Sequence, residues 1–153
     1  MTRTEEVREA TEEIREAFER LIPQLSPFHP APEIDLLWQV IRSPGTRLFV
    51  ARDADRRDAI AGTLTLVLFR IPTGLRARIE DVVVEEKSRG KGLGESLVRK
   101  AIACAREAGA DTVELTSNPE RKAAARLYTR LGFREIGTRL YRFTLADPRR
   151  QEG

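Results

Sequence analysis

The feature that most restricts the fold is a strand-like segment that leads through a cluster of glycines into a helix-like segment. Residues 76–84 have strand character, and a helical repeat of apolar residues begins at Leu93. The glycines between and beside them, Gly90, Gly92 and Gly94, allow the backbone to turn sharply and to approach a ligand closely. Since the N–H groups that open a helix are unpaired and lie at its positive end, the sequence predicts a phosphate-binding turn.

Two common nucleotide-binding motifs do not fit this turn. In a P-loop the lysine is followed by serine or threonine, whereas Lys91 is followed by Gly92. A dinucleotide-binding fingerprint that starts at Gly90 requires glycine or alanine at position 95, which is Glu95. Neither motif describes this turn, and glycines before a helix can also form a plain connector.

The rest of the chain alternates between helical and strand patterns. Apolar residues at steps of three and four predict a helix that ends near Leu25, with Thr11 as its N-cap; residues 3–9 fit either a short strand or an earlier helix start. Further elements are expected at 33–42 (helix), 47–52, 59–70 and 76–84 (strands), 93–108 (helix), 112–116 (strand), 119–131 (helix, capped by Asn118), and 133–138 and 140–145 (strands). This order predicts an α/β fold around one mixed, mostly antiparallel central sheet flanked by helices.

Length and composition favour a single globular domain over residues 1–153, with a helical segment 1–45, a core of about 46–145 and a frayed tail 147–153. Apolar runs are too short to span a membrane and no signal sequence is evident, so we expect a cytoplasmic protein. The net charge of +3 comes from interspersed residues of both signs, which argues against a nucleic-acid partner. With one histidine and one cysteine, the chain lacks the residues for a His- or Cys-rich metal site or an intrachain disulfide.

Two sequence blocks carry a family resemblance. Arg89-Gly90-Lys91-Gly92-Leu93-Gly94 matches R-x-x-G-x-G, and residues 118–133 are similar to N-x-x-A-x-x-L-Y-x-x-L-G-F, apart from Asn-Pro-Glu-Arg-Lys before the alanines. Together they resemble the GNAT N-acetyltransferase superfamily, most strongly over 79–133. Residues 21–26 and 78–84 look like those of bacterial members whose substrate is unassigned.

The resemblance implies that acetyl-CoA is the co-substrate and that a primary amine accepts the acetyl group by direct attack in a ternary complex. Backbone groups of Val82, Val83 and Val84 would pair with the pantetheine arm, as an added strand does. The diphosphate would bind backbone N–H groups of Arg89, Gly90, Lys91, Gly92, Leu93 and Gly94. Asn118 would lie beside the coenzyme, and Tyr128 would face the sulfur.

Acetyl transfer also needs groups that move protons. An amine must lose a proton to react, which a carboxylate with a raised pKa can accept; Glu80 is preferred over Asp81, although a strand carboxylate could simply pair with Arg76 or Arg78. A phenol can return a proton to the leaving thiolate, so Tyr128 is the candidate acid, although its spacing also fits a core aromatic. Cys104 shares an apolar helix face and is expected in the core.

Two other interpretations stay open: an acyl-CoA-binding regulatory module without turnover, and an unrelated nucleotide-binding domain. We expect the acceptor between the N-terminal helices, the proline-rich segment 22–33 and the turn 70–77, which together contain Phe28, His29 and several arginines. A peptide N-terminus, a lysine, a polyamine and an antibiotic amine all remain open as the acceptor. A homodimer is allowed because homodimers are common in the superfamily.

Overall fold

The computed structural model describes residues 2–146, in two compact units that divide between Thr116 and Ser117. The predicted tail 147–153 lies outside the described residues. That residues 1–153 form one domain stays a prediction. Among residues 2–146, no helix has both the length and the apolar character needed to cross a bilayer.

The first unit is built on a five-stranded sheet in the order β1-β2-β3-β4-β5, which confirms the predicted fold class. The first four strands are antiparallel neighbours and β5 is parallel to β4. The strands are β1 (Arg3–Glu6), β2 (Thr46–Asp53), β3 (Ala59–Ile71), β4 (Gly74–Val84) and β5 (Thr112–Glu114). A two-residue turn, Pro72-Thr73, joins β3 to β4, since Ile71 pairs with Gly74.

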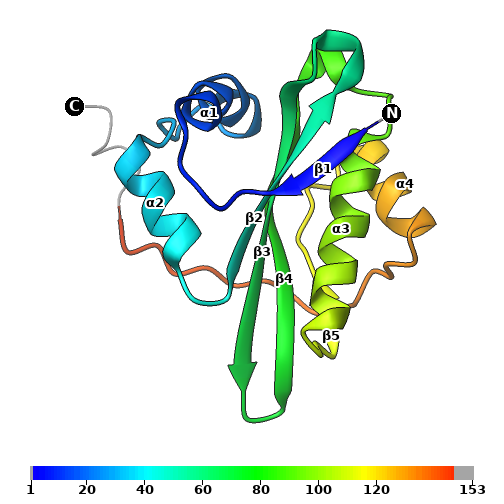
Figure 1. Ribbon diagram of the computed structural model, residues 1–153. Helices are drawn as coiled ribbons and strands as arrows, with labels where there is room; N and C mark the ends of the chain where they lie inside the picture. Colours follow the sequence, from blue (N-terminus) through cyan, green and yellow to red (C-terminus); the bar gives the residue numbers. More distant parts are fainter. Residues whose placement is uncertain (1, 147–153) are drawn as a thin grey trace. The chain divides into compact units, whose positions relative to one another are not determined.

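Helices cover both faces of this sheet, with α1 and α2 on one side and α3 on the other (Figure 1). They are α1 (Glu12–Leu25), α2 (Ile34–Arg42) and α3 (Leu93–Glu107). Thr11 caps α1 as predicted, because its Oγ1 accepts a hydrogen bond from Ile14 N at 3.2 Å. A core cluster joins α1 and α2 to the sheet through residues that include Phe18, Leu21, Leu37, Val50 and Val83.

The second unit departs from two predictions. Its helix α4 (Lys122–Arg130) begins at Lys122, so the expected start at Pro119 with Asn118 as cap is wrong. Asn118 instead closes a local turn, in which Glu120 N donates to its Oδ1 at 2.9 Å. The strands predicted over 133–138 and 140–145 are also wrong. A strand needs a hydrogen-bonded neighbour, and no other strand exists within the described part of this unit.

Candidate functional site

The glycine turn leads from β4 into α3 through a short 3-10 helix, η2 (Glu86–Ser88). Gly90 and Gly92 have φ angles of +80° and +86°, in the left-handed region that other residues adopt only with strain. A Cβ added to either would find no heavy atom within 4 Å, so this side of the backbone faces open space. Gly92 is the N-cap of α3 and has no side chain to pair with the helix N–H groups. Uncapped N–H groups at the start of a helix can bind an anion, and we call those of this turn the N–H cradle.

The opposite side of the turn is held by side chains. Lys91 places its Nζ 2.9 Å from Asp53 Oδ2 and 3.4 Å from Asp55 Oδ2. Arg89 donates from Nε to the backbone oxygen of Val84 at 3.0 Å. The side chains of the turn thus bond to the protein, while its glycines stay exposed on the other side.

The edge of β4 next to this turn is open along half of its length. β5 pairs with β4 only at Arg76, Ala77 and Arg78. On that edge no strand within residues 2–146 pairs with Ile79 to Val84. Val82, Val83 and Val84 therefore lie on a sheet edge that an extended ligand can join by backbone hydrogen bonds.

A β-bulge interrupts β4 where the two candidate carboxylates lie. Thr65 of β3 pairs with Glu80 and Thr63 pairs with Val83, so two residues, Asp81 and Val82, oppose one residue of β3. Asp81 has a φ of +50°, which aspartate tolerates better than most residues. The bulge interrupts the regular alternation of side chains along the strand and turns Glu80 and Val83 to the same face, the one covered by α1 and α2.

The two carboxylates differ in their surroundings. Glu80 accepts a hydrogen bond from Arg78 Nε, the pairing that the sequence left open. Asp81 keeps exposed surface, yet crowding of its carboxyl by surrounding protein raises its pKa above the ordinary value. The charge of Glu80 raises this pKa further, whereas His29 lowers it. Asp81 thus meets the requirement for a proton acceptor better than its ion-paired neighbour.

Tyr128 and Asn118, the other predicted site residues, belong to the second unit. Tyr128 is partly buried on α4 and packs edge-to-face on Phe133, with ring centroids 5.7 Å apart. Burial raises the pKa of its phenol above the ordinary value, so the group stays protonated at neutral pH. The phenol therefore holds the proton that a general acid must give.

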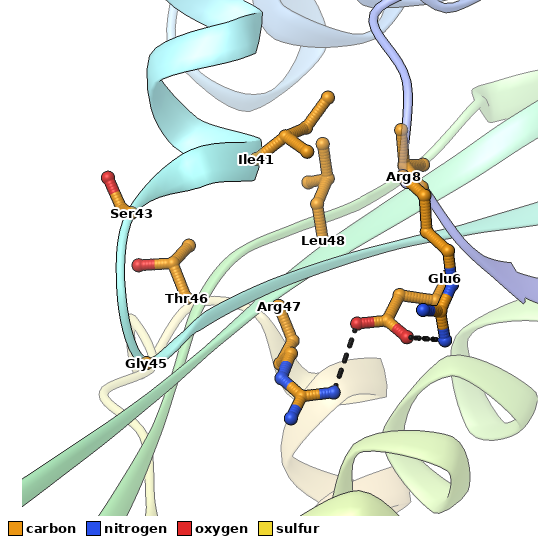
Figure 2. A pocket seen from close by; sticks show the side chains of 9 residues that line it. Glu6, Arg8, Ile41, Ser43, Gly45, Thr46, Arg47 and Leu48 are labelled. Carbon is orange, nitrogen blue, oxygen red and sulfur yellow. Dashed lines mark hydrogen bonds and ion pairs between the residues drawn. The ribbon is translucent and has the colours of Figure 1, made fainter.

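A separate pocket of about 450 Å³ lies between β1, the start of β2 and the end of α2. Figure 2 shows its two arginines, Arg8 and Arg47, turned toward the carboxylate of Glu6. Their distances to Glu6 oxygens are 2.9 and 3.2 Å. None of the predicted site residues lines this pocket.

Comparison with protein families identifies residues 8–133 as an acetyltransferase of the GNAT family. The chain belongs to this family. It is 33% identical over 124 residues to glucosamine 6-phosphate N-acetyltransferase 1 of Oryza sativa subsp. japonica, covering 77% of this chain and 73% of that protein. It is 38% identical over 68 residues to the aminoalkylphosphonate N-acetyltransferase of Salmonella typhimurium, covering 44% of this chain and 42% of that protein.

Among solved structures, a putative acetyltransferase from Agrobacterium tumefaciens has the same fold, with a TM-score of 0.80 and 24% identity over 93% of this chain and 99% of that one. The chain spans only 26% to 42% of the length of several relatives that it matches. These comparisons establish the family and the fold, and GNAT acetyltransferases use acetyl-CoA as their co-substrate.

Sequence reasoning missed two parts of this site. The bulge at Asp81 was missed because it depends on how many residues the partner strand β3 contributes. Asp53 was missed because its partners, Ser88 and Lys91, lie 35 and 38 residues further along the chain. Its only local signal is an aspartate at the end of a strand, which is common in loops.

Proposed function

We propose that this protein transfers the acetyl group of acetyl-CoA to a primary amine by direct attack in a ternary complex. The observation that carries the proposal is the continuity of the open edge of β4 with the glycine turn. Residues 82–84 offer an unpaired strand edge, and the N–H cradle at residues 89–94 follows within one short loop. A coenzyme with an extended amide-containing arm and a diphosphate matches both parts.

The residues of the chain would have distinct roles in the reaction. Backbone groups of Val82 to Val84 would align the thioester, and an N–H near Val83 would stabilise the negative charge that builds on its carbonyl oxygen. As the amine nitrogen bonds to the carbonyl carbon and the carbon–sulfur bond breaks, a carboxylate accepts the amine proton. Tyr128 donates its phenolic proton to the sulfur, so the products are the acetylated amine and free coenzyme A.

Glu80 and Asp81 are the two candidates for the base, and a substitution at each position distinguishes them. Asp81 is the stronger candidate because its raised pKa brings it closer to the pKa of the group it must deprotonate, whereas Glu80 is engaged by Arg78. Asp81→Asn should lower turnover far more than Glu80→Gln, at unchanged affinity for coenzyme A. The opposite order would return the role to Glu80.

We further propose that the acceptor is a small amine that carries a phosphate, phosphonate or similar anionic group. Two relatives are named for such acceptors, glucosamine 6-phosphate and aminoalkylphosphonates. On β4, Arg76 and Arg78 share a face with Glu80. Arg78 uses Nε for Glu80 and retains other donors, and the buried Nε of Arg76 has no partner among the described residues.

The decisive experiment combines binding with turnover. Isothermal titration with coenzyme A should give a one-to-one complex, and acetyl-CoA should release free thiol in the presence of an accepted amine. Matched pairs test the acceptor class: glucosamine 6-phosphate against glucosamine, and 2-aminoethylphosphonate against ethanolamine. We expect the anionic member to react faster, and Arg78→Gln to reduce that preference while Arg99→Gln, on α3, leaves it unchanged.

Each outcome has a defined meaning. Absence of coenzyme binding would overturn the proposed function. Binding without turnover over the whole amine panel would support a regulatory module of the same fold. Equal rates for both members of each pair would overturn the acceptor class and leave the acetyltransferase assignment standing.

A further inference from the structure

A buried carboxylate lies directly behind the glycine turn. Asp53 is the last residue of β2, and only 3% of its side chain is exposed. Its Oδ2 accepts hydrogen bonds from Ser88 Oγ at 2.6 Å and from Lys91 Nζ at 2.9 Å, and its Oδ1 accepts one from Asp55 N at 3.0 Å. A buried charge is tolerated only with such partners, so this arrangement is specific.

Two of these three partners belong to the turn that follows β4. Ser88 and Lys91 are three residues apart, and Glu85, three residues earlier, bonds to Arg56 at 2.7 Å. Arg56 also donates to Ser88 Oγ at 3.2 Å, which leaves the Ser88 hydroxyl proton for Asp53. The side chains at 85, 88 and 91 therefore fasten one side of the turn to the end of β2 and to η1 (Ala54–Arg56).

The other side of the turn carries the glycines at 90 and 92, which face open space. The orientation of the backbone N–H groups in the cradle therefore depends on the side-chain contacts that hold residues 85, 88 and 91. Lys91 interacts with the carboxylates of both Asp53 and Asp55, so its charge is already balanced within the protein. Diphosphate binding would then rely on the geometry of the backbone more than on a lysine point charge.

The hydrogen bonds from Ser88, Lys91 and Asp55 lower the pKa of Asp53 to about 2. The contacts of Lys91 with the carboxylates of Asp53 and Asp55 raise the pKa of its ammonium group. Both groups are therefore charged over the whole physiological pH range, and the turn stays fastened throughout it.

We propose that Asp53 is a positioning residue for coenzyme binding, which holds the turn 86–92 in its anion-binding shape through Ser88 and Lys91. The inference rests on the proposed function, since it assumes that the turn binds the diphosphate of coenzyme A. In this role Asp53 would act through Ser88 and Lys91, without touching the coenzyme or the reacting atoms.

The test compares Asp53→Asn with Asp58→Asn, an aspartate whose half-exposed side chain pairs with Arg3 at 2.9 Å outside this network. Asparagine keeps the shape but loses the charge that both partners bond to. We expect the dissociation constant of coenzyme A to rise about tenfold to a hundredfold in Asp53→Asn, the range for lost charged hydrogen bonds. The Michaelis constant for acetyl-pantetheine, which lacks the diphosphate, and kcat at saturation should stay close to wild type.

Asp58→Asn should match wild type in all of these measurements. Unchanged coenzyme affinity in Asp53→Asn would overturn the inference, as would an equal loss with acetyl-pantetheine, which would show a general loss of structure. If the wild type itself failed to bind coenzyme A, the proposed function would fall instead.

A second variant covers the case in which Asp53→Asn does not fold. Lys91→Met removes a partly exposed side chain and leaves Asp53 in place. It should speed hydrogen exchange of the amides of residues 88–92 in the ligand-free protein and weaken coenzyme binding. A lysine that merely touched the diphosphate would leave exchange in the free protein unchanged, and that result would refute positioning through Asp53.

Discussion

The substitution Gly92→Ala should weaken coenzyme binding much more than it lowers the stability of the protein. Gly92 has a φ of +86°, and a Cβ there meets no heavy atom within 4 Å. The substitution therefore adds no clash within the protein, only the strain of the left-handed conformation, about 1–2 kcal/mol. Reduced freedom of the unfolded chain returns about 0.4–1 kcal/mol, so the net loss of unfolding free energy should be about 1 kcal/mol.

For a chain of this size that loss corresponds to a decrease of about 2–4 °C in Tm. Coenzyme binding should suffer much more, because the new methyl group occupies the open side of the cradle. Loss of one charge-assisted backbone hydrogen bond would raise the dissociation constant about tenfold or more. Gly92→Val, with a larger side chain, should abolish binding.

Gly109 provides a matched control at the other end of α3. Its φ is +83°, and a Cβ there also meets nothing within 4 Å. Gly109→Ala should therefore lower Tm as much as Gly92→Ala and leave coenzyme affinity intact, measured by thermal melting and isothermal titration. Wild-type affinity in Gly92→Ala would refute the assignment of the turn as the diphosphate site. Weakened binding in both variants would show that the loss of affinity comes from lower stability alone.

Three further predictions concern titratable groups. Tyr128→Phe should lower kcat with coenzyme affinity nearly unchanged; unchanged kcat would remove Tyr128 as the acid. Asp81→Asn should lower kcat but raise Tm near neutral pH, because a carboxyl with a raised pKa costs stability once it is ionised. The difference in Tm between variant and wild type should grow as pH rises from about 4, and a constant difference would contradict this. Asp53 has a lowered pKa, so the wild type should lose stability as pH falls from about 4 toward 2, whereas Asp53→Asn should not lose this contribution. Parallel curves of Tm against pH for the two proteins would contradict this prediction.

Elements that depend on nearby residues could be predicted from the sequence. Thr11 begins α1 through a contact three residues away, and Gly109 adopts the left-handed conformation expected after a helix. The glycine turn was found for the same reason, since strand, glycines and helix follow one another directly. Local chemistry decides such features before any tertiary contact forms.

Features set by distant residues could not be predicted. The residue pattern at Tyr141, Phe143 and Leu145 is typical of a strand, yet pattern alone does not supply a neighbour to pair with. Asp53 looked like an ordinary loop aspartate until folding placed it beside Ser88 and Lys91. In both cases the outcome depends on spatial partners that no spacing in the sequence records.

The bulge in β4 has a consequence for how members of such a family can diverge. Ala77 and Ile79 are buried opposite Leu68 and Leu66 of β3, whereas Val83 belongs to the core beneath α1 and α2. Loss of a single codon at position 81 or 82 would remove the extra residue and leave every flanking side chain on its present side of the sheet. Such a descendant would keep its buried residues on both faces of the sheet, while the strand of the proposed active site straightened. One deletion would then be a short evolutionary route from the proposed enzyme to a folded protein without catalysis.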